Sequence, residues 1–396
     1  MRLLRPIAVL YLALWGAQAS AFDTEARAAF VLDQTTGTVL MEKNPDTPLP
    51  PASMSKLMTL YMAFEAIADG RLSVDETLPV SQHAMSYGGS TMFLDTTDRV
   101  TVEDLLRGII VLSGNDACVV IAEALSPDGT EAGFARMMTD RAQRMGMTNS
   151  TFTNSNGWPS AGQRMSVRDL AILADRLITD FPTFYPLFAE QEFLFDGRSP
   201  SNVRNRNPLL GLGIGADGLK TGHTQEAGYG LVGSAKQGDR RIIFVLTGLD
   251  TVGQRAEESE RIVNWGFRQF VQKEVAKAGT RIAQADIWMG TQPSVGLTTA
   301  EDISLLLPVL DQKEVAAEVV YTGPVEAPVA EGQEIAELVV SLDGLPEVRL
   351  PLVAEAAVER GGFGVRMRTA ALVLLSKIAP TAAAQAGALA TQDEGA

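Results

Sequence analysis

The chain has 396 residues, enough for two or three domains, and 46% of them are hydrophobic, which is typical of globular proteins with real cores. Its formal net charge of −15 argues against a nucleic-acid partner, because nucleic-acid binding needs clustered Lys and Arg. One cysteine, Cys118, excludes an internal disulfide, and with only two histidines, His83 and His223, a zinc site of the usual His/Cys kind is not expected.

The first residues have the pattern of a secretory signal. A basic start, Met1–Arg5, precedes an apolar stretch at Ile7–Ala17, which is short for a membrane span. The residues Ala19-Ser20-Ala21 then fit an A-x-A cleavage site. We therefore expect residues 1–21 to be a signal peptide, with a mature chain that begins at Phe22 and works in the periplasm.

Residues 22–279 are expected to form an α+β domain. The pattern predicts strands at 28–33, 38–42, 227–235 and 240–248, and helices after Ser53, at 131–145, after the capping residues Thr101 and Ser166, and at 254–271. Strands come first and last, with helices between them. The expected sheet is therefore antiparallel and is built from both ends of the segment.

The start of the first helix carries a serine three residues before a lysine. Ser53 and Lys56 lie three apart at the beginning of an apolar run, so they share one helix face. A lysine is costly to bury there unless it has a function. A buried neutral Lys56 can accept the proton of Ser53 and make it a nucleophile.

Two further segments indicate a function for Ser53 and Lys56. Ser113-Gly114-Asn115 lies between two apolar stretches, and Lys220-Thr221-Gly222 leads into a strand-like run. Together, and in this order, the three segments match the S-x-x-K, S-D-N-like and K-T-G motifs of penicillin-binding proteins and serine β-lactamases. The second motif here reads S-G-N.

The C-terminal part changes in character. Strand-like runs at 285–288, 303–307, 317–321, 337–342 and 348–353 predict a small β-sandwich domain over residues 280–358. Residues 361–380 have apolar positions at helical spacing and are expected to form an amphipathic helix that lies on a membrane surface, although packing on the protein is the alternative. Residues 381–396 are expected to be a disordered tail.

The motifs resemble those of the D-alanyl-D-alanine carboxypeptidases, the low-molecular-mass class C penicillin-binding proteins of the penicillin-binding protein 5 type. The resemblance extends over nearly the whole mature chain and implies a penicillin-binding, β-lactamase-like transpeptidase domain, a β-rich second domain and a terminal membrane anchor. It also implies that the protein needs no cofactor or metal. Its expected partners are the D-Ala-D-Ala end of peptidoglycan pentapeptides, β-lactams as covalent inhibitors, and the outer face of the cytoplasmic membrane.

The resemblance also implies roles for individual residues. Ser53 is the nucleophile, Lys56 its general base, and Ser113 relays a proton to the leaving amine. The remaining positions bind substrate: Asn115 at the acyl-side amide, Lys220, Thr221 and Arg255 at the terminal carboxylate, Gly222 by leaving room along the strand edge, and His223 through its backbone N–H, which forms an oxyanion hole with that of Ser53.

Other interpretations stay open at this point. Arg255 is alternatively a surface residue at a helix start, His223 an alternative base for Ser53, and Cys118 either a packing residue or a reactive thiol. The same motifs fit a D,D-endopeptidase, a transpeptidase or a β-lactamase, although residues 157–181 show no E-x-x-L-N pattern for a deacylating base. A catalytically silent cell-wall-binding protein is the alternative of a different class.

Overall fold

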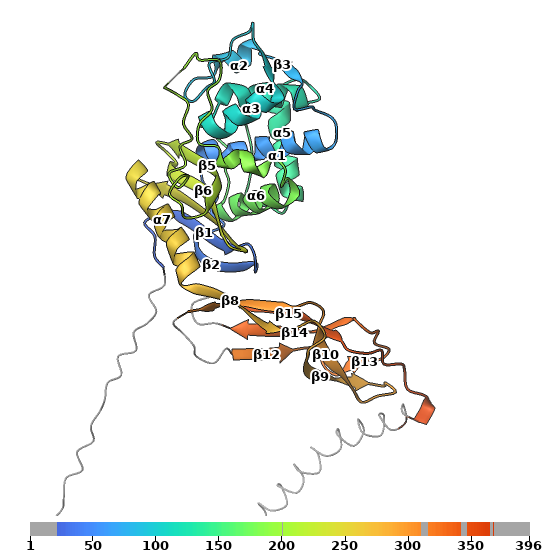
Figure 1. Ribbon diagram of the computed structural model, residues 1–396. Coiled ribbons are helices and arrows are strands. Elements are labelled where there is room, and N and C mark those ends of the chain that lie inside the picture. The colour runs from blue at the N-terminus through green and yellow to red at the C-terminus, as the bar shows by residue number, and fades with distance from the viewer. Residues whose placement is uncertain (1–21, 200, 310–315, 342–346, 365–366, 368–396) are drawn as a thin grey trace, which may run out of the picture.

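The computed structural model describes residues 22–199, 201–309, 316–341, 347–364 and 367. These form two bodies, a larger one of helices and sheet and a smaller one of strands (Figure 1). The expected signal peptide, most of the expected terminal helix and the expected tail lie outside the described residues. None of the helices described in this structure is long and apolar enough to cross a membrane.

The larger body is built on one antiparallel sheet, as predicted. Its strands are β1 (Ala28–Asp33), β2 (Thr38–Lys43), β5 (Ala216–Thr224), β6 (Gly228–Gln237) and β7 (Arg240–Leu249), in the order β2-β1-β7-β6-β5. The first two strands come from the start of the chain and the other three from the end of this body. β5 therefore lies at an edge, which leaves one side of its backbone without a neighbouring strand of this sheet.

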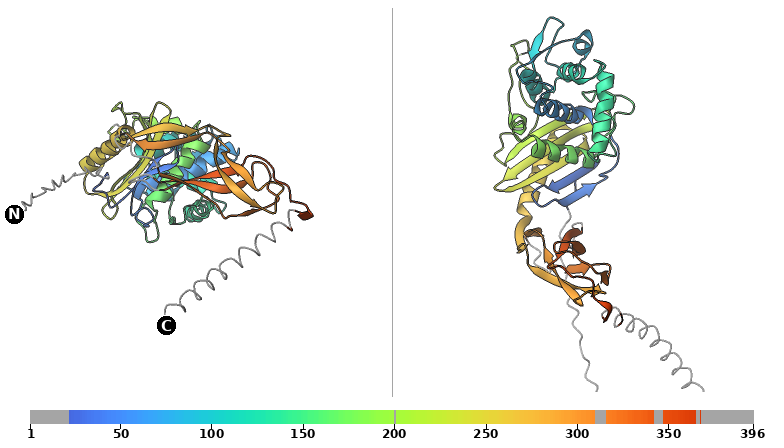
Figure 2. Two further views of the ribbon diagram at one scale, coloured as in Figure 1. Left: turned by 90° about the horizontal axis from the view of Figure 1, so that it is seen from below. Right: turned by 90° about the vertical axis from the view of Figure 1, so that its right-hand side faces the viewer.

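Helices cover both faces of this sheet (Figure 2). Along β7, Ile243 and Val245 join the larger core beneath the helices, whereas Ile242, Phe244 and Leu246 join the core beneath the last helix, α7 (Val252–Arg268). This alternation follows from the two-residue period of a strand. α7 starts with a complete capping box between Thr251 and Gln254.

The remaining helices form a layer that carries two of the three motifs. They are α1 (Lys56–Ala68), α2 (Gln82–Ser86), α3 (Val102–Arg107), α4 (Asn115–Leu125), α5 (Glu131–Arg144) and α6 (Val167–Asp180), with a two-stranded ribbon of β3 (Thr77–Pro79) and β4 (Arg99–Thr101). Thr101 and Ser166 cap α3 and α6 as expected. α1 is buried almost all round, which holds its first turn rigidly.

The smaller body is the expected β-rich domain. It contains β8 (Phe270–Ala276), β9 (Arg281–Trp288), β10 (Ser294–Thr299), β11 (Ile303–Pro308), β12 (Ala316–Val320), β13 (Val325–Glu326), β14 (Glu334–Ser341) and β15 (Val348–Ala354). Six strands form one sheet in the order β12-β14-β15-β10-β9-β13, and β8 pairs with β11. Ile303 and Leu305 of β11 share a hydrophobic core with that sheet, which gives two packed layers.

The predicted helix over residues 254–271 is too long at its C-terminal end. The helix ends at Arg268, because Phe270 and Val271 instead start β8 and pair with Pro308 and Leu307. The strands β8, β10 and β13 of the smaller body were not expected from the sequence. The predicted domain boundary at Gly279 stays a prediction. The strand β8 precedes this residue and pairs with β11, which follows it.

Candidate active site

The serine and lysine of the first motif meet at the start of α1. Ala52–Ser55 form a 3₁₀ turn, η1, that runs directly into the helix. Residues three apart eclipse in a 3₁₀ turn, so Ser53 and Lys56 project to the same side. The Lys56 Nζ lies 3.0 Å from the Ser53 Oγ. The predicted pairing of these two residues is therefore present in the structure.

The Lys56 amine is oriented by two further oxygen atoms. Its Nζ donates to the Asn115 Oδ1 at 2.7 Å and to the backbone oxygen of Asn156 at 2.5 Å. Both oxygens are only acceptors, so they take two N–H bonds of the amine. In the neutral amine, the lone pair is then left to point at the Ser53 hydroxyl. This arrangement suits a base for the serine proton.

Burial favours the neutral form of Lys56, which is the form that can accept a proton. The side chain is fully buried. Loss of hydration lowers the pKa of Lys56 to about 8, with a contribution from the positive charge of Arg206, while the carboxylates of Asp116 and Glu131 oppose the shift. A lysine in water has a pKa near 10.4, so the neutral form is far more accessible here.

This shift predicts the pH dependence of acylation. Below a pH of about 8, Lys56 is mainly an ammonium and has no lone pair for the Ser53 proton. The second-order rate constant for acylation by a β-lactam is therefore expected to rise as the pH increases through about 8 and then to level off. Stopped-flow or labelling rates between pH 5 and 10 measure this profile. A rate that is flat over this range would contradict the assignment of a titrating base.

The second and third motifs meet beside the first. The Lys220 Nζ on β5 donates to the Ser113 Oγ at 3.0 Å. Ser113 follows the π-helical turn η2 (Gly108–Leu112) in the left-handed region, with φ of 64°, which is uncommon for a residue with a side chain and occurs often at functional sites. Burial, and then the charges of Lys56 and Arg206, lower the pKa of Lys220 well below its usual value. A negative substrate group would favour its charged form.

The edge strand β5 forms one wall of the site. Thr221 is buried there, and a side chain at Gly222 would meet Met54 and the backbone oxygen of Pro51 at 3.0 Å. Gly222 therefore allows β5 to pack closely on η1, a reason that the sequence did not suggest. The ring of His223 stacks on Tyr229 with centroids 3.9 Å apart.

Two arginines form the far side of the site. Arg255 on α7 is 6% exposed, and its Nη2 donates to the backbone oxygen of Arg206 at 3.2 Å. Burial lowers the pKa of the Arg255 guanidinium. The Arg206 Nη1 donates in turn to the Ser90 Oγ at 2.7 Å. Arg255 was predicted from its sequence context, whereas Arg206 lies in a loop with no motif to mark it.

These residues surround one open cavity of about 490 Å³. Ser53, Ser113, Thr221, Gly222, His223 and Arg255 line it, together with Ser90, Arg206, Tyr229 and Val252. Lys56, Asn115 and Lys220 lie buried behind that lining and bond to one another or to it. All nine predicted site residues thus belong to one site. The carbonyl of Asn156 was missed, because a backbone oxygen has no sequence signature.

Cys118 does not extend this site. Cys118 is fully buried in α4, and burial raises the pKa of its thiol to about 12, which favours the packing interpretation over a reactive thiol. Within the part of the chain that the structure describes, no group of three or more His, Cys, Asp or Glu side chains has the arrangement to hold a metal ion.

Comparison with known proteins connects this geometry to named families. Residues 16–251 match the family model described as D-alanyl-D-alanine carboxypeptidase, and residues 270–360 match the model described as penicillin-binding protein 5, C-terminal domain. Among curated relatives, the D-alanyl-D-alanine carboxypeptidase DacC of Escherichia coli is 36% identical over 350 residues, which cover 86% of each chain. DacF of Bacillus subtilis is 34% identical over 88% of this chain and 90% of the relative.

Solved structures agree with these matches. Penicillin-binding protein 5 from Haemophilus influenzae superposes with a TM-score of 0.74 at 33% identity, covering 87% of this chain and all of that one. Penicillin-binding protein D2 from Listeria monocytogenes in its ampicillin-bound form gives a TM-score of 0.55 at 32% identity, covering 62% of this chain and 98% of that one. The similarity therefore includes both bodies of the molecule.

Proposed function

The chain belongs to the D-alanyl-D-alanine carboxypeptidase family, and on this premise we propose how its residues divide the reaction among them. The protein is a serine-type D-Ala-D-Ala carboxypeptidase that acts on peptidoglycan and binds β-lactams. Two features of the cavity support the division of roles. Ser53, a half-buried serine of its lining, lies against a buried lysine, and cationic groups surround the space beside that serine.

The proposed acylation starts at the lone pair of Lys56. The Ser53 Oγ attacks the carbonyl carbon of the penultimate D-alanine while its proton passes to the Lys56 Nζ. The C–N bond to the terminal D-alanine then breaks as the Ser113 hydroxyl relays the proton from the Lys56 Nζ to the leaving nitrogen, which leaves Lys56 neutral again. The products are free D-alanine and an ester on Ser53, which water hydrolyses with Lys56 again accepting a proton. With a β-lactam, the broken C–N bond lies in a ring, so the amine stays attached.

Substrate is proposed to lie along the free edge of β5 as an additional strand. The backbone N–H groups of Ser53 and His223 stabilise the charge on the carbonyl oxygen. The stacking of the His223 ring on Tyr229 supports a backbone role for this residue rather than a role as base. Asn115 contacts the acyl-side amide, while Lys220, Thr221 and Arg255 contact the terminal carboxylate.

One observation carries this proposal, namely the contact of 3.0 Å between the Lys56 Nζ and the Ser53 Oγ in a buried setting. Release of D-alanine from a D-Ala-D-Ala peptide tests it, together with labelling by a fluorescent penicillin. We expect release of D-alanine and a long-lived label. A label that is lost within seconds would indicate a β-lactamase, and no label would indicate a silent wall-binding protein. The family matches favour neither of these alternatives.

The Arg255→Ala variant tests how the terminal carboxylate is recognised. We expect it to reduce D-alanine release by about one to two decades, which corresponds to loss of one charge-assisted hydrogen bond. Acylation by penicillin should fall much less, because the strained ring is intrinsically reactive. The comparison uses a D-Ala-D-Ala peptide with a free carboxylate and the same peptide as its C-terminal amide. Only cleavage of the free acid should depend strongly on Arg255.

A matched control for Arg255 lies on the same helix. Arg268 is in the last turn of α7 and does not line the cavity, so Arg268→Ala should leave both rates unchanged. If the native protein cleaves the amide as well as the acid, the carboxylate is not recognised. The protein would then act as an endopeptidase or transpeptidase rather than as a carboxypeptidase.

For its location, we propose a periplasmic enzyme held at the outer face of the cytoplasmic membrane. The signal-like pattern of residues 1–21 supports export, and the amphipathic pattern of residues 361–380 supports attachment. Residues 22–279 would then form the catalytic domain, residues 280–358 a spacer between that domain and the membrane, and residues 381–396 a free tail.

Removing residues 362–396 should give an active enzyme that no longer sediments with membranes. The cut keeps Gly361, whose N–H donates to the backbone oxygen of Met289, so the β-rich domain retains this hydrogen bond. Fractionation of cells that express each form measures attachment, and penicillin labelling measures the site. A full-length Leu375→Asp variant, with a charge on the apolar face, should also detach. Equal solubility of all forms would contradict the anchor.

A further inference from the structure

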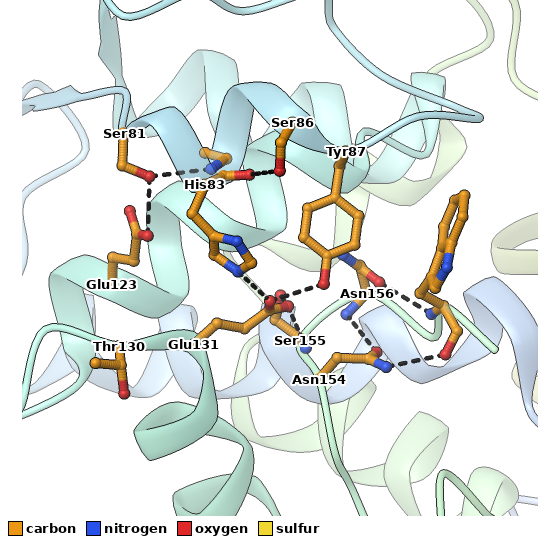
Figure 3. A network of polar contacts seen from close by, with 12 residues as sticks. Ser81, His83, Ser86, Tyr87, Glu123, Thr130, Glu131, Asn154, Ser155 and Asn156 are labelled. Carbon is orange, nitrogen blue, oxygen red and sulfur yellow. Dashed lines mark hydrogen bonds and ion pairs between the residues drawn. The ribbon is translucent and has the colours of Figure 1, made fainter. Parts of the chain in front are cut away.

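A buried carboxylate lies behind the active site without lining its cavity. Glu131 is the first residue of α5 and is 6% exposed. Four donors converge on its two oxygens, two on each (Figure 3). Its Oε1 accepts from the backbone N–H of Ser155 at 2.9 Å and from the Ser155 hydroxyl at 2.6 Å. Its Oε2 lies 2.8 Å from both the Tyr87 hydroxyl and the His83 Nε2.

The Oε1 holds the segment that provides one acceptor for Lys56. Ser155 is followed directly by Asn156, whose backbone oxygen lies 2.5 Å from the Lys56 Nζ. The same segment is held from α1, where the Thr59 hydroxyl donates to the Ser155 backbone oxygen at 2.5 Å. On its other side, this segment packs against η1. Gly157 lies so close to the backbone oxygen of Ala52 that an added Cβ atom would be only 1.9 Å from it. The position of the Asn156 carbonyl is therefore determined from three directions.

The Oε2 holds the segment that orients the other acceptor. Tyr87 is followed directly by Gly88, whose backbone oxygen accepts from the Asn115 Nδ2 at 2.8 Å. That bond determines which end of the Asn115 amide faces Lys56, and the Asn115 Oδ1 lies 2.7 Å from the Lys56 Nζ. Each Glu131 oxygen therefore holds a residue, Ser155 or Tyr87, that directly precedes a carbonyl group. The Asn156 carbonyl contacts the Lys56 amine, and the Gly88 carbonyl acts on it through the Asn115 amide.

We propose that Glu131 is a positioning residue that aims the lone pair of Lys56 at Ser53 through the Asn156 and Gly88 carbonyls. This inference rests on the proposed role of Lys56 as the base. A carboxylate suits the position, because it can accept from two donors on each oxygen, whereas an amide has one oxygen that only accepts and one nitrogen that only donates. Its charge also stands at the N-terminus of α5, where a negative charge is favourable.

The charge of Glu131 provides a readout that simple packing would not affect. The ionisable groups whose charges act on Lys56 are Asp116 and Cys118 of α4, Arg206, Lys220 of β5 and Glu131. The negative charge of Glu131 raises the pKa of Lys56 against the effect of burial. Removing that charge should move the midpoint of the acylation profile to lower pH. The plateau is the rate of acylation at high pH, where Lys56 is neutral. This rate depends on how well the lone pair of Lys56 is oriented toward Ser53.

The experiment compares Glu131→Gln and Glu131→Ala with the native protein by acylation with a β-lactam between pH 5 and 10. Both variants should show a midpoint at lower pH. Glu131→Ala should also lower the plateau by roughly 10- to 100-fold, because a small misplacement of the base is costly. In Glu131→Gln the carbonyl oxygen can still accept from Ser155, but the amide nitrogen cannot accept from Tyr87, so the plateau should fall severalfold and less than in Glu131→Ala. The KM for a D-Ala-D-Ala peptide should change little in Glu131→Gln.

Glu123→Gln is the matched control. Glu123 is a carboxylate of α4 in the same polar cluster, it accepts from the Ser81 hydroxyl at 2.9 Å, and it has no bond to Ser155 or Tyr87 (Figure 3). Its variant should keep the native midpoint and plateau. The proposal is overturned if Glu131→Ala folds and keeps both the native plateau and midpoint, or if Glu123→Gln loses as much as Glu131→Ala.

Two milder variants decide the matter if Glu131→Ala does not fold. Ser155→Ala and Tyr87→Phe each remove one hydroxyl donor to one oxygen of Glu131. Each should lower the plateau severalfold with the unfolding temperature nearly native, and an unchanged plateau in both overturns the proposal. Failure of the proposed function looks different: the native protein would then not be acylated, or Lys56→Ala would be acylated at the native rate.

Discussion

The Ser53→Ala variant is expected to take up no penicillin label and to release no measurable D-alanine. One oxygen atom forms the covalent bond in the proposed mechanism, and alanine offers no substitute for it. Loss of a nucleophile of this kind reduces the turnover number by on the order of 10⁴-fold or more. The measurements are gel fluorescence after incubation with labelled penicillin, the yield of D-alanine, and mass spectrometry of the intact protein.

The fold should survive this change. Ser53 is half-buried at the cavity wall, and its hydroxyl contacts Lys56 rather than a structural group. Ser55→Ala serves as a control within the same motif, because the Ser55 hydroxyl accepts from the Gln163 Nε2 at 2.8 Å and has no place in the proposed chemistry. It should label normally. Normal labelling of Ser53→Ala, in contrast, would show that the nucleophile has been assigned wrongly.

The Lys56→Ala variant is expected to be nearly as inactive, and Lys56→Arg should not restore the activity. Alanine removes the lone pair that accepts the Ser53 proton. Arginine stays protonated at every accessible pH, so it returns the positive charge without returning a base. Rates of acylation by a β-lactam measure both variants. The pH dependence that is expected near pH 8 in the native protein should be absent from any residual rate.

The arginine variant also separates the two possible bases. If Lys56→Arg recovers acylation, another group accepts the proton, and His223 is the residue to test next. The double variant Lys56→Arg with His223→Ala would then lose the recovered activity. Thermal unfolding of each protein is needed beside the rates, since a guanidinium at a fully buried position is costly and can destabilise the fold.

Much of the fold was predictable because local patterns and tertiary packing agree. The continuous apolar run Ile242–Leu246 of β7 suits a strand that is buried on both faces, and the side-chain caps at Thr101 and Ser166 mark helix starts that the structure retains. The end of α7 was not predictable in the same way. Nothing local stops the helix before Phe270, and only the pairing of β8 with β11 places that residue in a strand.

The candidate site likewise has a part that the sequence predicts and a part that it does not. Ser53 and Lys56 are three residues apart, so one turn of chain brings them together, and the three motifs bring in Ser113, Asn115 and Lys220. These contacts involve side chains whose chemistry can be read from their residue types. The sequence by itself therefore determined the proposed nucleophile, its proposed base and the kind of substrate.

Only the tertiary structure decided how the base is aimed. The acceptors of Lys56 include the backbone oxygen of Asn156, one hundred residues away along the chain, and every residue has such an oxygen. Glu131 has no motif, and its proposed role follows from four donors that two separate segments, one with His83 and Tyr87 and one with Ser155, bring to its two oxygens. Hydrogen bonds act over about 3 Å. Which groups come within that distance is set by the packing of α1, α2 and α5, and that packing is a property of the folded chain.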